Sequence, residues 1–283
     1  MILVTGGTGT CGGEIVSQLA ATGTPFRAMV RDPGKALSLK ITGVEIVVGD
    51  FSKPETLGPA LKRIDQVLLL TGPNPRQVEL ECNLVDAAKK AGVRHIVKFS
   101  AMTADPKSPS TFPNWHGQIE QKIKASGLAW TFLRPTFFMQ NLLGLAGMVK
   151  GGTIYQPAAD SKAGFVDTVD IAAVAVEALT EPGHEGHAYD ITGPELLSYH
   201  DIARIFSEVL GKPIAYQDIP PAAAKQAMIG TGVPEWTADA INQLMDQMRA
   251  GEYAKLSTAV QDVGKKDPVS LKAFLTEHAG AFR

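Results

Sequence analysis

Short runs of apolar and β-branched residues alternate with helix-like segments over the first 135 residues of the chain. Continuous apolar runs of this length are typical of strands buried on both faces of a sheet. They predict strands at residues 1–4, 26–30, 44–48, 66–70, 95–99 and 130–133. Between them apolar residues recur at helical spacing, as in Leu80, Leu84 and Ala88. This alternation predicts a parallel sheet with helices on both faces.

The regular alternation weakens after residue 136. Apolar spacing predicts helices at residues 137–148, 171–179, 201–210, 235–248 and 271–278, and a late strand at 188–192. We therefore expect a first domain over residues 1–150 and a return to its sheet within 165–193. A smaller, mostly helical lobe over residues 194–283 would then cover one end of the sheet.

Three glycines follow the first predicted strand at intervals of three residues: Gly6, Gly9 and Gly12. A helical pattern begins directly after them. A glycine turn lets backbone approach a pyrophosphate closely, and a helix N-terminus attracts its negative charge. This order of strand, turn and helix is typical of dinucleotide-binding proteins, so we expect a Rossmann-like doubly wound α/β fold. The predicted phosphate-binding residues are Gly6, Gly7, Thr8, Gly9, Thr10, Cys11 and Gly12.

The end of the second predicted strand bears on which dinucleotide is bound. A carboxylate at this point usually binds the ribose 2′-hydroxyl of NAD, whereas a basic residue accommodates the 2′-phosphate of NADP. Here Arg31 ends the strand and Lys35 follows it, and both could hold that phosphate. Asp32 keeps an NAD interpretation open. The sequence favours NADP(H) over NAD(H).

Ligands of doubly wound sheets lie beyond the carboxyl ends of the strands. After the third strand, Asp50 could accept a hydrogen bond from adenine and Phe51 could pack on the base; a helix cap is the alternative for Asp50. After the fourth, Thr71, Gly72 and Pro73 could approach the nicotinamide ribose or form a bare turn. Further residues expected beside the cofactor at later strand ends are Ser100, Pro135 and Phe137.

Composition excludes several classes of protein. The chain has 283 residues, of which 45% are hydrophobic, and a net charge of -2, which gives no electrostatic basis for binding nucleic acid. No apolar run approaches the roughly 20 residues of a membrane span. We expect no leader, because the first predicted strand begins at residue 1, and two cysteines, Cys11 and Cys82, form no disulfide framework. We expect a cytoplasmic protein, monomeric or homodimeric, without membrane contact.

Two other arrangements of chemically active residues carry little weight. His184 and His187 lie in a glycine-broken loop without an evident third ligand, so no metal site is predicted. Ser100, His116 and Asp105 could be drawn as a hydrolytic triad, but the chain has no Gly-x-Ser-x-Gly nucleophile elbow.

His116 is the candidate catalytic residue. It lies near the start of the predicted helix that follows the fifth strand, beside the edge where a hydride acceptor should bind. A histidine there could donate a proton near neutral pH. It could equally bind the cofactor ribose or only water.

Taken together, these segments resemble the NmrA-like branch of the atypical short-chain dehydrogenases/reductases. The matching segments are residues 4–12, 30–31, 49–50, 91–97, 116–120, 133–141 and 165–171. Residues 232–235 and 251–252 are similar to the subgroup that contains triphenylmethane-dye and quinone reductases. The resemblance implies a Rossmann-like nucleotide-binding domain.

The chain departs from ordinary short-chain dehydrogenases in lacking their Tyr-x-x-x-Lys pair. No lysine stands four residues after any tyrosine, whereas His116 and Glu120 have the spacing of that pair. In NmrA-like relatives a lysine often stands where His116 does. Some members of the family are nucleotide-sensing regulators without activity.

We therefore expect an NADPH-dependent reductase that transfers hydride to a quinone, a dye or a related conjugated or carbonyl acceptor. The alternative is an NADP(H)-binding redox sensor without catalysis. A sugar-nucleotide epimerase fits worst, because its chemistry depends on the missing tyrosine. Residues predicted to line an apolar cleft for a flat aromatic or carbonyl substrate, some of which could equally be ordinary core, are Met102, Phe138, Asn141, Tyr155 and Phe165.

Overall fold

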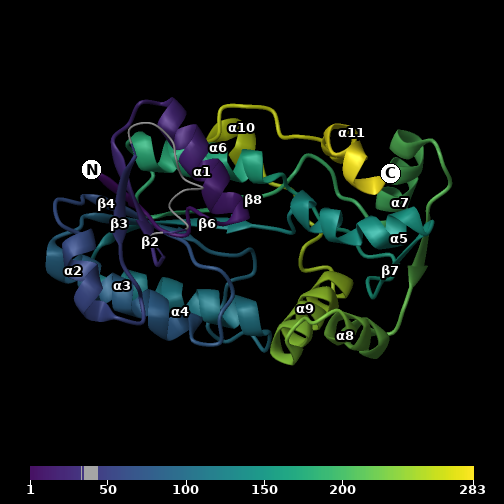
Figure 1. Ribbon diagram of the computed structural model, residues 1–283, viewed down its shortest axis with the longest axis horizontal. Helices are drawn as coiled ribbons and strands as arrows, with labels where there is room; N and C mark the ends of the chain where they lie inside the picture. Colours follow the sequence, from purple (N-terminus) through teal and green to yellow (C-terminus); the bar gives the residue numbers. More distant parts are fainter. Residues whose placement is uncertain (33, 35–43) are drawn as a thin grey trace.

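The computed structural model describes residues 1–32, 34 and 44–283, and a parallel sheet organises it (Figure 1). In this described part the sheet has seven strands in the order β3-β2-β1-β4-β5-β6-β8. The strands are β1 (Ile2–Val4), β2 (Phe26–Val30), β3 (Glu45–Val48), β4 (Gln66–Leu69), β5 (His95–Phe99), β6 (Ala129–Pro135) and β8 (His187–Ile191). The order reverses between β1 and β4, which is where doubly wound sheets bind their ligands. The predicted α/β class and the late strand are confirmed.

Helices cover both faces of this sheet, as the alternating pattern predicts (Figure 1). On one face α1 (Thr10–Ala21) packs against α6 (Thr168–Thr180), and both contribute to the same apolar core as β1 and β2. On the other face lie α2 (Leu57–Ala60), α3 (Gln77–Ala91) and α4 (Thr111–Ser126). Two separate apolar layers therefore hold the sheet between them.

A second, smaller part of the molecule lies beyond β6 (Figure 1). It has its own apolar core and a two-stranded parallel sheet. Its elements are α5 (Ala146–Lys150), β7 (Thr153–Gln156), α7 (Tyr199–Leu210), β9 (Ala215–Asp218), α8 (Pro221–Gly230), α9 (Glu235–Arg249) and α11 (Leu271–Glu277). The sequence did not reveal β7 and β9. Residues Met139–Leu145, expected to start an α-helix, form a 3-10 helix instead.

The smaller part does not begin and end where the sequence suggested. β7 belongs to it although it precedes residue 194. Conversely, α10 (Ala259–Asp262) returns to the large sheet, where Ala259 and Val260 join the core beneath α6. Lys255, just before α10, forms an ion pair with Asp190 at 2.7 Å, and this pair links the returning segment to β8. The chain therefore crosses between the two parts several times.

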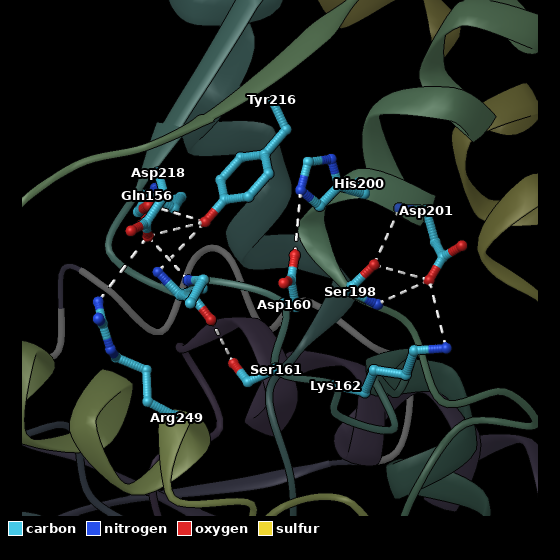
Figure 2. A network of polar contacts seen from close by, with 12 residues as sticks. Gln156, Asp160, Ser161, Lys162, Ser198, His200, Asp201, Tyr216, Asp218 and Arg249 are labelled. Carbon is cyan, nitrogen blue, oxygen red and sulfur yellow. Dashed lines mark hydrogen bonds and ion pairs between the residues drawn. The ribbon is translucent and has the colours of Figure 1, made fainter.

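A polar network fixes the segment that leads back toward the sheet (Figure 2). The Tyr216 hydroxyl on β9 donates to the carbonyl oxygen of Gln156 at 3.0 Å. Asp218 accepts a hydrogen bond from the backbone N–H of Ala159 at 2.8 Å, and Ala159 has a positive φ of 46°. On α7, Ser198 and Asp201 form a capping box. Residues 157–162 are therefore held in place just before Ala163 and Phe165 enter the apolar core.

Candidate functional site

A cavity of about 560 Å³ lies at the carboxyl edge of the large sheet. The ends of β1, β4, β5 and β6 form one wall, and α4 and α9 contribute to the others. The glycine turn and apolar side chains such as Phe112, Phe137 and Leu244 line the same space. A nucleotide held at the turn would therefore share one cavity with a substrate held against these side chains.

Two of the three spaced glycines are required by close backbone contacts. Gly6 has a φ of +69°, and a Cβ atom there would lie 2.6 Å from the carbonyl oxygen of Leu70. A Cβ atom at Gly12 would lie 2.0 Å from the carbonyl oxygen of Gly6. Larger residues at either position would displace the turn.

The start of α1 suits a bound phosphate group. Its N-cap residue, Gly9, offers no side chain to the first-turn N–H groups. Gly9, Thr10 and Cys11 all line the cavity. Burial, with a smaller contribution from Asp167, raises the pKa of the Cys11 thiol to about 12, so no thiolate opposes an anion there. Of the remaining turn residues, Gly7 is buried away from this cavity. Thr8 lines a separate, smaller cavity at the end of β2.

This second cavity, of about 290 Å³, lies at the end of β2 and is lined by Thr8, Val30, Arg31, Asp32 and Asp50. Arg31 is exposed and can meet a phosphate from solvent. Asp32 accepts a hydrogen bond from the Gly34 N–H at 2.8 Å. Lys35, the other predicted phosphate ligand, lies outside the described residues.

The two residues predicted to bind adenine differ in where they lie. Asp50 reaches the second cavity, but its Oδ1 accepts 2.8 Å hydrogen bonds from the Ser52 N–H and hydroxyl. These bonds lower the pKa of Asp50, which caps the turn at Ser52; the helical turn that follows has Lys53 as its N-cap, so Asp50 is not the helix cap of the alternative prediction. Phe51 is only 7% exposed, packs in the core beneath α2 and α3, and lines neither cavity. Its ring is therefore not presented to a base.

The other predicted strand-end residues gather in the large cavity: Thr71, Gly72, Pro73, Ser100, Pro135 and Phe137. The Thr71 hydroxyl donates to Glu81 at 2.7 Å. Glu81 pairs with Lys98 at 2.8 Å, and both side chains are enclosed. Sequence reasoning missed this pair, because a lysine in the middle of an apolar strand gives no sign of its partner.

Ser100 and Glu120 form a second buried group. The Ser100 hydroxyl donates to Glu120 at 2.6 Å, and Arg134 binds the same carboxylate through two nitrogen atoms. Glu120 stands where the lysine of a Tyr-x-x-x-Lys pair would be if His116 replaced the tyrosine. It is committed to Arg134 and Ser100, and therefore supports the wall of the cavity.

His116, the predicted catalytic residue, lines the cavity. Burial, and then the positive charge of Lys98, lower the pKa of His116 well below its ordinary value. Its Nδ1 atom is enclosed without a hydrogen-bond partner. Protonating Nδ1 would bury an N–H group without an acceptor. His116 can therefore donate a hydrogen bond as a neutral ring, but it holds no acidic proton near neutral pH.

The predicted substrate residues divide into two groups. Met102, Phe138 and Asn141 line the cavity. Phe165 is 2% exposed and lies behind Phe137, with ring centroids 5.8 Å apart. Tyr155 is 41% exposed on β7 and lines neither cavity. Phe165 therefore supports the cavity from the core, and Tyr155 lies outside it.

Several cavity residues escaped sequence analysis because their elements lie far apart along the chain. They are Gln77, Phe112, Gln140, Thr237, Ile241, Leu244 and Tyr253. The helical pattern of α9 places Thr237, Ile241 and Leu244 on one face, so that pattern was the available signal. Gln140 also donates to Asp167, the N-cap of α6, at 2.7 Å. Tyr253 carried no comparable signal.

Two further properties concern only the described ranges 1–32, 34 and 44–283. Within them no helix combines the length and apolarity needed to cross a bilayer. The same residues contain no group of three or more histidine, cysteine, aspartate or glutamate side chains placed to hold a metal ion.

Comparison with known proteins relates the whole chain to reductases. The model of the NmrA-like family matches residues 1–275. The NAD(P)H azoreductase of Xenophilus azovorans is 43% identical, covering 100% of this chain and 99% of the relative. Quinone oxidoreductase 2 of Escherichia coli is 30% identical, over 84% of this chain and 85% of the relative. The crystal structure of Citrobacter sp. triphenylmethane reductase complexed with NADP(H) is similar with a TM-score of 0.90 and 29% identity, over 99% of this chain and 100% of that chain.

Proposed function

This chain belongs to the NmrA-like family, and from that premise we propose that it is an NADPH-dependent reductase of quinones, dyes or related conjugated or carbonyl acceptors. One observation carries the proposal: a single cavity of about 560 Å³ joins the glycine turn to an aromatic and aliphatic wall. Flat apolar acceptors suit such a wall. The names of the azoreductase, quinone oxidoreductase and triphenylmethane reductase relatives support this class.

NADPH supplies the hydride, and the protein supplies binding and orientation. In this proposal the N-terminus of α1 holds the pyrophosphate, because its first-turn N–H groups have no side-chain cap. Arg31 holds the 2′-phosphate in the second cavity. The crystal structure of the triphenylmethane reductase contains NADP(H), which favours the same choice here.

The side chains of the large cavity would then position the acceptor. Phe137, Phe138 and Leu244 exclude water and favour a flat ring. His116 and Ser100 lie at the polar side, where the neutral imidazole orients groups through hydrogen bonding. Acceptors that stabilise added electrons by conjugation need no acidic residue. This requirement matches a site whose histidine is held neutral.

The direct test is NADPH oxidation by the purified protein with quinones, cationic dyes, azo compounds and simple ketones. We expect turnover with conjugated acceptors, faster with NADPH than with NADH, and little with simple ketones. Tight NADPH binding without turnover of any acceptor would instead identify a redox-sensing regulator.

The proposal also includes the setting of the enzyme. Both cysteines are free thiols, which supports a reducing compartment such as the cytoplasm. A small aromatic or carbonyl substrate is the proposed partner, and a net charge of -2 does not favour nucleic acid. Light scattering of the purified protein would decide between the monomer and the homodimer.

A further inference from the structure

Tyr253 is one of the residues that line the large cavity. The residue follows α9 and is only 4% exposed. Its ring packs against Phe137, with centroids 4.7 Å apart and the ring planes inclined by 56°. Phe137 in turn packs on Phe165 in the core. The ring of Tyr253 is therefore held in one position beside the apolar surface.

The hydroxyl of Tyr253 lies 3.1 Å from Oγ1 of Thr103, and either atom can be the donor. Thr103 follows β5, and the Met102 N–H just before it donates to the Pro135 carbonyl oxygen at 3.0 Å. Thr103 has a φ of +65°. This conformation is rare for a β-branched residue, and such conformations cluster at functional sites. The loop after β5 thus holds the Thr103 hydroxyl against the phenol of Tyr253.

Counting hydrogen atoms shows that this pair has a free donor. Each hydroxyl carries one hydrogen, and their mutual bond uses one of the two. Across the described residues, neither hydroxyl makes another hydrogen bond to the protein. When Thr103 donates to Tyr253, the phenolic hydrogen has no acceptor among the described residues and is free to bond a ligand. Burial raises the pKa of Tyr253 to about 12, so the phenol stays protonated at neutral pH.

We propose that Tyr253, oriented by Thr103, donates this hydrogen bond to the oxygen atom that becomes negative when a quinone or another carbonyl acceptor is reduced. The inference rests on the proposed reductase function. It assigns Tyr253 as a catalytic residue for carbonyl-type acceptors and Thr103 as its positioning residue. It also makes the hydroxyl pair a determinant of which acceptors the site reduces fastest.

The charge that an acceptor carries after hydride transfer explains why the hydroxyl pair should affect the reduction of different acceptors differently. A quinone that receives a hydride becomes a hydroquinone monoanion, NADPH becomes NADP⁺, and a proton from water completes the hydroquinone. A hydrogen bond at the negative oxygen lowers the barrier to this step. A cationic triarylmethane dye that receives a hydride at its central carbon becomes neutral. No atom of the dye gains negative charge, so the same hydrogen bond gives it no advantage.

The test compares Tyr253→Phe with the unchanged protein, using 1,4-naphthoquinone and the cationic dye malachite green at saturating NADPH. We expect the kcat for the quinone to fall about 10- to 100-fold. The kcat for the dye should stay within about twofold, because the phenylalanine ring still packs on Phe137. NADPH affinity, measured by fluorescence titration, should not change.

Two further substitutions separate chemistry from packing. Thr103→Val should lower the quinone rate and add little to Tyr253→Phe, whereas Thr103→Ser keeps the hydroxyl and should preserve the rate. The matched control is Tyr216→Phe (Figure 2). It also removes a tyrosine hydroxyl bonded within the protein, but Tyr216 lines neither cavity. Its kinetics with both acceptors should match those of the unchanged protein.

An unchanged quinone rate in Tyr253→Phe, or equal losses with quinone and dye, would overturn the inference. If the unchanged protein reduces neither acceptor, the proposed function fails and binding decides the inference separately. Calorimetric titration of 1,4-naphthoquinone into the NADP⁺-loaded protein should then show binding about 3- to 10-fold weaker in Tyr253→Phe. Equal affinity of the two proteins, or no binding to either, would refute the role of Tyr253.

Discussion

Two walls of the large cavity are built in different ways. The wall at the sheet edge depends on backbone: the turn between β1 and α1 leaves no space for a Cβ atom at Gly6 or Gly12. The wall contributed by α9 and the residues after it depends on side chains, among them Ile241, Leu244 and Tyr253. The first wall has little freedom to vary, whereas the second can change by single substitutions without disturbing the sheet.

The difference suggests how one fold can keep its cofactor while its acceptor changes. Backbone N–H groups bind any pyrophosphate in the same way, whatever reaction follows. In the proposed function, side chains of α9 contact the acceptor, and their size and hydroxyl groups influence which acceptor fits. We therefore expect substitutions in the first wall to affect every reaction, and substitutions in the second to affect acceptors selectively.

The largest effect is expected at Gly12. Its substitution by alanine places a Cβ atom 2.0 Å from the Gly6 carbonyl oxygen, so the turn must move. We expect NADPH binding to weaken about 100-fold or more, and stability to fall by about 1–3 kcal/mol. Gly13→Ala is the matched control, because its Cβ atom would have an ordinary 3.6 Å contact. Calorimetric titration that gave both variants normal affinity would contradict the role of the turn.

A smaller, cofactor-selective effect is expected at Arg31. Arg31→Ala removes a charged hydrogen-bond donor worth about 1.5–3 kcal/mol. NADPH affinity should therefore fall about 10- to 100-fold, while NADH, which lacks the 2′-phosphate, should bind nearly as before. Arg204→Ala, on α7 and paired with Glu208, controls for the loss of an exposed charge. Equal losses for the two cofactors would remove Arg31 from the phosphate site.

Leu244→Ala tests the wall contributed by α9. The substitution removes three carbon atoms from the apolar surface, so we expect KM for a bulky dye to rise about tenfold with NADPH affinity unchanged. Ile229→Ala on α8 is the control, because Ile229 is half-buried and lines neither cavity. Steady-state kinetics that showed the same rise in KM for both variants would indicate general loosening of the lobe.

The smallest effect concerns the neutral state of His116. Its pKa is lowered in the folded protein, so below about pH 6.5 the unfolded chain binds a proton that the folded chain does not. This contribution destabilises the protein as pH falls through about 6.5. Between pH 7.5 and 5.5 this contribution lowers the free energy of unfolding by about 1 kcal/mol. In His116→Asn this part of the pH dependence should be absent from the free energy of unfolding measured in urea. A variant with the same pH dependence as the unchanged protein would show that His116 titrates normally.

The fold was largely predictable because its signals are local. Apolar runs, helical spacing and glycine positions act over a few residues, and they placed β2 and β5 at the bounds that the structure shows. β7 and β9 were missed, because each is short and joins a partner about 60 residues away. The lobe could not be delimited for a similar reason: α10 returns to the large sheet through tertiary contacts alone.

The site was predictable only in part. Residues directly after strands reach the cavity by their position, as Thr71 and Ser100 do. The direction of an aromatic side chain is not set by position, and so Phe51 and Phe165 are buried in cores. The charge of His116 could not be predicted either, because it depends on enclosure and on Lys98 from a different element.

The sequence by itself determined the cofactor half of this protein. A tight turn, a helix start and a basic residue after β2 are suited to binding phosphate through local backbone geometry and charge, which neighbouring residues specify. Only the tertiary structure decided the proposed acceptor half, where Thr103 and Tyr253 meet across 150 residues of chain. Such a contact exists only after the sheet and the lobe have packed together, and no short-range pattern in the chain encodes it.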